Sequence, residues 1–296
     1  MTGISRRGKW MLAGAGAAAV ILAGWLFFPQ FQTVRANSDL AVANASIGQA
    51  NRLVASIDTD ALKTAGFSSV NEIHQEQSLL DQYSRRLNWA GSEIRQADAE
   101  ASSAAGLARL PGGYRNYLQA KAAVARLRLK QLGNLQEAVA KLKRLYGSGN
   151  VIFQSLNDMD RLLGQLQTAI SELQANPDAA RTSLENVSKS MRIIQQQLDQ
   201  RRAQTGFDLL TDMSQEVSGD ADVADLASRV AAAVATGSQS QAEASAQALV
   251  TRLLGLKATT DDVDRWMILN IDPLLNGYDQ MQTEAKQLDS QAKALH

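Results

Sequence analysis

The hydrophobic pattern along most of the chain has the period of an α-helix. Apolar side chains recur at steps of three and four residues, and no stretch keeps the alternation of a half-buried strand. The segments with this spacing are 40–57, 80–101, 118–146, 152–173, 184–198 and 267–295. The pattern therefore predicts an all-α fold: an elongated antiparallel helical bundle that resembles a coiled coil.

Two of these segments predict a helical hairpin at 151–205. Each segment has a seam, meaning a row of apolar side chains on one face of the expected helix. The first seam consists of Ile152, Leu156, Met159, Leu163, Leu166, Ile170 and Leu173, and the second of Leu184, Val187, Met191, Ile194 and Leu198. Between them, Asn176 suits an N-cap and Pro177 the first helical position, where its missing N–H costs nothing. Since the link is short, we expect the two helices to be antiparallel.

Glycine and proline predict where the long helices end. Gly66, the turn at 110–113, the run 147–150 and Gly206 interrupt the seams. We expect a bundle of long helices over 30–206, and shorter helices that pack on it over 207–296.

Within this C-terminal part, Ser218, Gly219 and Asp220 are expected to open a helix that Gly237 stops. Capping boxes are expected to start the next two helices, the first at Ser238 and the second at Thr259. A further break is expected at 272–273, as either a kink or a cap followed by a new helix.

One stretch departs from amphipathic spacing. Residues 11–28 contain no charge, and Trp10 at one end and Trp25, Phe27 and Phe28 at the other resemble interfacial aromatics. Because roughly 20 apolar helical residues cross a ~30 Å hydrocarbon layer, we expect a signal-anchor helix at 10–29 that spans the bilayer and is closed by Pro29. The alternative is a cleaved secretory signal with a small-residue site at Val34 and Ala36.

Charge next to this span predicts its orientation. Arg6, Arg7 and Lys9 precede it, whereas Arg35 is the one basic residue in the twenty that follow. By the positive-inside rule, 1–9 are cytoplasmic and the rest is extracytoplasmic, in the periplasm if the cell is Gram-negative. The expected location is the cytoplasmic (inner) membrane.

Small residues in the span offer a face for self-association. Gly14 and Ala18, four residues apart, would let two such helices approach closely. Homo-oligomerisation is the functional interpretation of this spacing; the alternative is that an alanine-rich span forms such pairs by chance.

Composition argues against catalytic chemistry. The chain has no cysteine and two histidines, His74 and His296, and this inventory does not support a triad, a zinc site or a proton relay, because ligand clusters need several His, Cys or carboxylates at set spacing. Asp220, Asp222 and Asp225 lack the glycine and glutamate of an EF-hand loop, and we interpret them as first-turn carboxylates that complement a helix dipole. We expect no enzyme activity, no cofactor and no bound metal.

Charge is balanced overall, with 30 basic and 30 acidic residues, which argues against a nucleic-acid partner. The segment 109–144 is nevertheless one-sided, because Glu137 is its one acid. A candidate surface for an anionic partner consists of Arg115, Lys121, Arg126, Arg128, Lys130, Lys141, Lys143 and Arg144. The alternative is pairing within the chain, with acids at 208–225 or 261–264, or plain solvation.

These patterns favour an interaction protein. The leading hypothesis is a non-enzymatic scaffold or accessory subunit of an envelope complex, held in the bilayer by 10–29 and binding protein partners. The alternative is an extracytoplasmic sensor or ligand-binding module. The architecture resembles the helical ectodomains of bacterial membrane sensors, although a cytoplasmic tail of nine residues is too short for an output domain.

Overall fold

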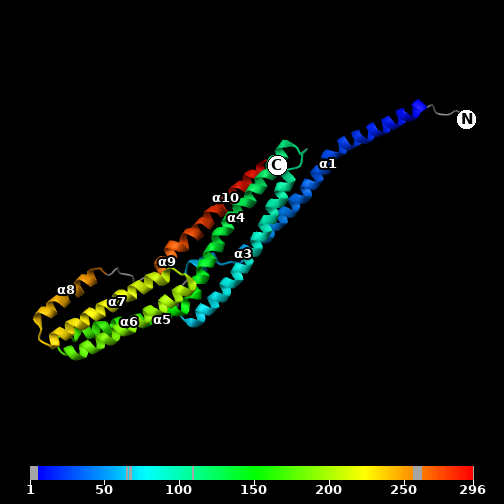
Figure 1. Ribbon diagram of the computed structural model, residues 1–296. Coiled ribbons are helices and arrows are strands. Elements are labelled where there is room, and N and C mark those ends of the chain that lie inside the picture. Colours follow the sequence, from blue (N-terminus) through cyan, green and yellow to red (C-terminus); the bar gives the residue numbers. More distant parts are fainter. Residues whose placement is uncertain (1–5, 65, 67–68, 109, 256–261, 296) are drawn as a thin grey trace. The chain divides into compact units, whose positions relative to one another are not determined.

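The computed structural model describes the backbone of residues 6–64, 66, 69–108, 110–255 and 262–295. Side chains are described in these ranges from residue 30 onward, except at 262. Every regular element in the described ranges is a helix, so the all-α prediction is confirmed (Figure 1). The helices are α1 (Arg6–Ala55), α2 (Thr59–Lys63), α3 (Val70–Ala105), α4 (Gly112–Gly147), α5 (Gly149–Ser171), α6 (Pro177–Thr205), α7 (Leu209–Ala235), α8 (Gln239–Gly255), α9 (Asp262–Asn270) and α10 (Asp272–Ala294).

The chain divides into two compact units that are not consecutive in sequence. Unit 1 consists of Met1–Asp58, Tyr83–Glu137 and Leu274–His296. Unit 2 consists of Thr59–Gln82 and Ala138–Pro273. Helices α3 and α4 therefore contribute residues to both units.

In unit 1, helices α1, α3, α4 and α10 form an up-and-down arrangement. Pairs of contacts establish the directions of the helices. They are Asn37 with Tyr114 and Asn51 with Arg128 for α1 and α4, Asp98 with Arg126 and Asn88 with Gln136 for α3 and α4, and Asp289 with Lys121 and Gly277 with Asn134 for α10 and α4. The residue numbers of the paired side chains increase in the same direction along α1 and α4, so these two helices are parallel. They increase in opposite directions along α3 and α4, so these two helices are antiparallel.

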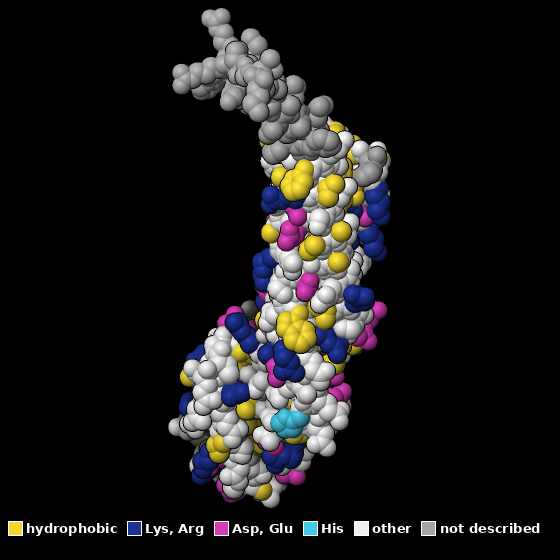
Figure 2. Space-filling model, turned by 90° about the vertical axis from the view of Figure 1, so that its right-hand side faces the viewer, with side chains coloured by type: hydrophobic (Ala, Val, Ile, Leu, Met, Phe, Trp, Pro, Cys, Tyr) yellow, Lys and Arg dark blue, Asp and Glu magenta, His cyan; other side chains and the backbone are white. Residues whose placement is uncertain are grey.

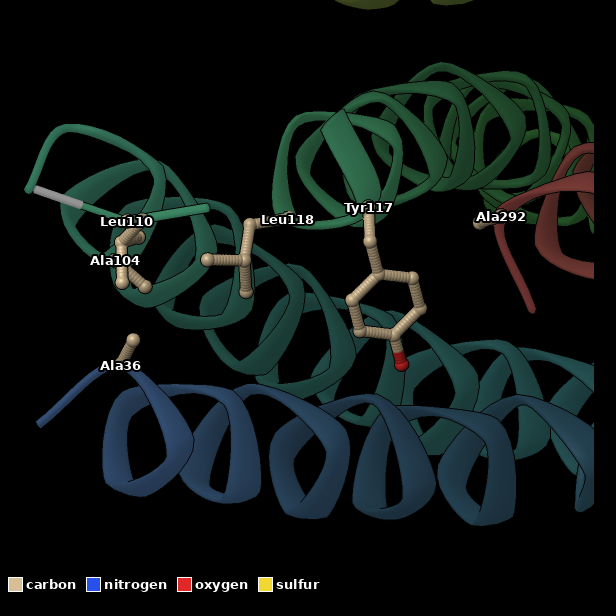
Figure 3. Packing of buried hydrophobic residues seen from close by; sticks show 6 residues of the cluster. All are labelled: Ala36, Ala104, Leu110, Tyr117, Leu118 and Ala292. Carbon is tan, nitrogen blue, oxygen red and sulfur yellow. The ribbon is translucent and has the colours of Figure 1, made fainter. Parts of the chain in front are cut away.

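A cluster of buried side chains joins these four helices at one end of unit 1. Ala36 of α1, Ala104 of α3, Leu118 of α4 and Ala292 of α10 are each fully buried. Figure 3 shows Leu118 and the ring of Tyr117 pointing from α4 into the space among the helices. The buried members from α1, α3 and α10 are all alanines, so the backbones of these helices can lie close together there.

Unit 2 is built around the predicted hairpin. Helix α6 packs on α5 and α7, and α7 packs on α8 and α9 (Figure 1). The predicted seam of α6 is confirmed, because all five of its residues are buried. The predicted cap is also confirmed: the side chain of Asn176 accepts a hydrogen bond from the Ala179 N–H, and Pro177 is the first residue of α6.

Several predicted helix ends are found where they were expected. Gly206 has φ +61° and Gly237 has φ +67°, the left-handed conformation that lets glycine end a helix. The break at 272–273 is a new start, because α9 ends at Asn270 and α10 begins at Asp272. The capping box expected at Thr259 lies outside the described residues.

Two predicted boundaries are wrong. Helix α1 does not end at Pro29 but continues to Ala55. Proline removes one backbone hydrogen bond, and the buried seam of α1 beyond it, Ala36, Ala43 and Ala50, favours continuing the helix. Helix α7 does not begin near Ser218 but at Leu209. Leu209, Leu210, Met213 and Val217 extend its buried face, which outweighs the ~1 kcal/mol that Gly219 costs inside a helix.

The expected membrane span is 10–29, and its side chains lie outside the described residues. Among the residues that the structure does describe, no helix has a stretch both long and apolar enough to cross a bilayer.

Candidate interaction surfaces

The basic residues of α4 were the first candidate site, and the structure gives six of the eight a partner within the chain. Near the start of α4, Arg115 donates hydrogen bonds to the carbonyl oxygens of Leu107 and Ala108, at 3.2 and 3.1 Å. These carbonyls follow α3, so Arg115 ties the connection between α3 and α4 to α4. Arg109 lies outside the described residues.

Lys121 forms the most buried ion pair in the described part of the chain. Its Nζ lies 2.5 Å from Oδ1 of Asp289 on α10, and the Lys121 side chain is 8% exposed. Asp289 also pairs with Lys293 at 3.2 Å. Burial acts to raise the pKa of Asp289, but hydrogen bonds from the two lysines outweigh it and lower that pKa below the ordinary carboxyl value.

Arg126 and Arg128 face different neighbours. Arg126 donates to Asp98 of α3 at 3.0 Å, and its side chain is 62% exposed. Arg128 is more buried and donates to the Oδ1 of Asn51 on α1. Burial lowers the pKa of Arg128, while the negative charge of Asp289 acts in the opposite direction.

The four remaining basic residues follow further along α4. In unit 2, Lys143 pairs with Asp81 at 2.6 Å and Lys141 donates to Asn270 at 3.4 Å. Lys130 and Arg144 are exposed, and no described residue bonds to either side chain. Of the eight candidates, these two are the ones with no internal partner to exchange for an anionic ligand.

The acids that pair with α4 are not the ones expected. Asp81, Asp98 and Asp289 take this role, and none of them lies in 208–225 or 261–264. Sequence spacing cannot identify such partners, because the pairs join helices whose register is established only by packing.

The acidic group at 220–225 belongs to a different network. Asp222 accepts from Arg192 of α6 at 2.5 Å and from Arg252 of α8 at 3.0 Å, and Asp225 lies 3.4 Å from Arg192. These carboxylates lie in the middle of α7, so the interpretation as first-turn residues is wrong. They connect three helices instead.

Helix α5 carries an apolar surface that the sequence pattern assigned to the core. Leu156, Leu163 and Ile170 are 44%, 42% and 38% exposed. The buried face follows Ile152, Ser155, Met159, Leu162, Leu166 and Ala169, which also step by three and four. The helix is thus rotated from the predicted orientation. We call Leu156, Leu163 and Ile170 the α5 stripe.

The width of the apolar arc was the signal that could have revealed this stripe. Leu162 and Ala169 directly precede Leu163 and Ile170, so apolar residues cover more of α5 than one neighbouring helix can bury. The sequence does not show which edge of the arc stays exposed.

Helix α8 also has an uncovered face. It packs on α7 but has no buried residue, and Val250, Leu253 and Leu254 are 54%, 48% and 83% exposed. On the face shown in Figure 2, basic and acidic side chains are interspersed and apolar ones are mostly scattered singly. Exposed apolar residues that share a helix face are therefore the more distinctive feature.

A metal site in the described ranges would need several ligating side chains close together. No group of three or more His, Asp or Glu side chains in these ranges could hold a metal ion. His74 is exposed and lies 3.4 Å from Gln77, its neighbour one turn on. Gly14 and Ala18, the candidate packing face of the span, lie outside the residues whose side chains are described.

Comparisons of the chain with protein-family models, with curated proteins and with solved structures give no match.

Proposed function

We propose that the chain is a single-pass membrane protein whose helical body is a non-enzymatic scaffold or accessory subunit of an envelope complex. In this proposal 10–29 cross the inner membrane, 1–9 are cytoplasmic and the helices from residue 30 onward are extracytoplasmic. The observation that carries it is the α5 stripe, three large apolar side chains left exposed at heptad spacing.

Heptad spacing favours a helical partner. Residues seven apart return to one side of a helix after two turns, so the three side chains lie along one side of α5 at intervals of about 10.5 Å. Covering the exposed part of each side chain would contribute roughly 1 kcal/mol, by scaling the value for full burial of a large apolar residue. Such a surface suits a helix from another protein or from a second copy of this chain.

Photo-cross-linking in native membranes tests the docking. A photoreactive phenylalanine derivative placed at Leu163 should capture a partner, because this position is the centre of the stripe. The same group at Gln165, an exposed polar position that helical geometry places on the opposite side of α5 from Leu163, is the matched control. Capture from neither position, or equally from both, would contradict docking on the stripe.

A second copy is identified in the same experiment by giving two tags to separately expressed chains. If the captured partner carries the other tag, the complex is a homo-oligomer. Gly14→Leu and Ala18→Leu would then show whether the membrane-spanning helices contribute to self-association, because bulky residues block their close approach. Unchanged capture in these variants would assign self-association to the stripe alone.

The topology has its own test. The chain contains no cysteine, so Ser240→Cys on the exposed surface of α8 introduces a single thiol. We expect this thiol to react with a membrane-impermeant maleimide in intact spheroplasts. Reaction only after lysis would reverse the proposed orientation.

A further inference from the structure

Unit 1 has a partly open cavity of about 260 Å³ among α1, α3, α4 and α10. Ala50, Val54 and Ile94 form part of its apolar wall, and Arg128, Gln131 and Lys286 bring polar groups to it. Ligand sites are typically ~300–1,000 Å³, so this volume suits a small molecule. Left to solvent, it would hold roughly eight waters at ~30 Å³ each.

Gln131 brings an amide to the wall of the cavity. Its side chain lines the cavity, and no described residue forms a hydrogen bond with it. The amide is not among the buried polar atoms that lack a partner, so solvent in the cavity can reach it. A ligand with hydrogen-bonding atoms would replace that solvent.

Arg128 brings a positive charge to the same wall. Its guanidinium donates to Asn51, but its Nε is buried without an acceptor and it forms no ion pair with a described carboxylate. Asp289 influences Arg128 electrostatically but is already shared by Lys121 and Lys293. Lys286 also lines the cavity, so positive charge is in excess around it.

We propose that this cavity binds a small carboxylate with a short apolar chain. The carboxylate lies against Arg128 and Gln131, because a guanidinium and an amide both donate to carboxylate oxygens. The chain lies against Ala50, Val54 and Ile94, where a fully hydrated anion such as sulfate would gain no apolar contact. This site does not depend on the proposed scaffold function.

The test is a titration of the full-length chain in nanodiscs with acetate, butyrate and hexanoate, followed by ligand-observed NMR. Burying each methylene should tighten binding by about fourfold, so butyrate, which has two more methylenes, should bind roughly 16-fold more tightly than acetate. Sulfate, which has the charge without the chain, should bind more weakly than butyrate. Equal binding of all four anions, or no saturation in the millimolar range, would overturn the proposal.

Two variants locate the binding, and a third is the control. Arg128→Gln should weaken butyrate binding by at least tenfold, and Val54→Phe should weaken it by narrowing the apolar part of the cavity. Arg126 is also an arginine of α4, but it pairs with Asp98 and does not line the cavity. Arg126→Gln should therefore change the affinity for butyrate by less than twofold. If Arg128→Gln fails to fold, Val54→Phe decides, since Val54 is half-buried and makes no polar contact. If Val54→Phe binds butyrate as tightly as wild type, the site is refuted. That result would not affect the photo-cross-linking test of the α5 stripe.

Discussion

The two units bury their helices around interiors of different character. In unit 2, the seam of α6 is wholly apolar, and the charges of Arg192, Asp222 and Arg252 lie at its rim with about 40% of each side chain exposed. In unit 1, the ion pair of Lys121 and Asp289 lies within the helix packing. Charged side chains therefore have different places in the two units. In unit 2 they lie at the border of an apolar seam, and in unit 1 one ion pair lies inside the helix packing.

The interior charges of unit 1 also have a regular spacing. Tyr114, Lys121 and Arg128 occupy successive heptad positions of α4, and Leu135 occupies the next. Each of the three polar side chains bonds to one residue of α1 or α10. Polar groups at seam positions favour a single register, because a shifted helix would leave them unpaired. We therefore expect unit 1 to depend on specific pairs, and unit 2 on apolar area.

The largest expected effect tests the apolar interior of unit 2. Leu166→Asp places a carboxylate at a position that is 7% exposed, and should lower the free energy of unfolding by about 4 kcal/mol or more. Hydrogen exchange of α5 and α6 amides, together with a thermal melt, measures the loss in unit 2.

Leu163→Asp is the matched control, with the same substitution three residues away on the α5 stripe. Because Leu163 is 42% exposed, we expect a loss of about 1 kcal/mol. Partner capture by a photoreactive group at Ile170, another residue of the α5 stripe, should nevertheless disappear. If both variants lose equal protection, the stripe contributes to the fold and is not a docking surface.

The next effect tests the interior charge of unit 1. Asp289→Asn leaves Lys121 buried without a counter-charge and should lower the free energy of unfolding by about 3 kcal/mol at neutral pH. Glu284→Gln, on the same helix but exposed, should change it by less than about 0.5 kcal/mol. Thermal melts of both variants test the contrast.

The pH dependence of this pair has a defined sign. The pKa of Asp289 is lower in the folded state than in the unfolded state. The ionised carboxylate therefore contributes fully to the free energy of unfolding above the ordinary carboxyl pKa, and this contribution is lost as pH falls through the lowered folded pKa. The difference between wild type and Asp289→Asn should therefore shrink on acidification below about pH 4. A difference that stays constant to pH 2 would show that the aspartate acts through packing and not through charge.

A smaller effect is expected at the rim of unit 2. Asp222→Asn weakens contacts to both Arg192 and Arg252, whereas Asp225→Asn affects one contact at 3.4 Å. Exposed pairs contribute about 0–1 kcal/mol, so we expect losses of about 1 kcal/mol for the first variant and less for the second. Both losses should decrease in 1 M salt, because the Debye length falls to about 3 Å. Equal, salt-independent losses would argue that the network is not electrostatic.

The elements of both units could largely be predicted from local sequence, because helical period and capping depend on neighbours in the chain. The seam from Leu80 to Ala101 is buried at each predicted position, and Asn176 caps α6 as expected. The start of α7 and the passage of α1 beyond Pro29 could not be predicted in this way. There, packing against other helices overrides local signals that favour a break.

The candidate surfaces were less predictable for a related reason. The seam pattern of α5 identifies an apolar arc but not which edge a neighbour covers, and that choice determines whether Leu163 is core or surface. The charge excess of α4 was visible in the sequence, whereas its partners depend on the register between helices far apart in the chain. The cavity beside Arg128 and Gln131 arises from that register, and no local motif marks it.

The smallest expected effect concerns Asp220, a partly buried carboxylate of α7 in unit 2. Burial raises its pKa, and the positive charge of Arg252 offsets this only in part. With a raised folded pKa, the folded state binds the proton more tightly than the unfolded state, so stability falls as pH rises from the ordinary carboxyl pKa through the folded value. At neutral pH, Asp220→Asn should therefore be slightly more stable than wild type, by no more than about 0.5 kcal/mol. Below pH 3 the two should melt alike, because both side chains are then neutral. A variant that is less stable than wild type at neutral pH would show that the contact with Arg252 outweighs burial, and Asp220 would then belong with Asp222 to the rim charges that support unit 2.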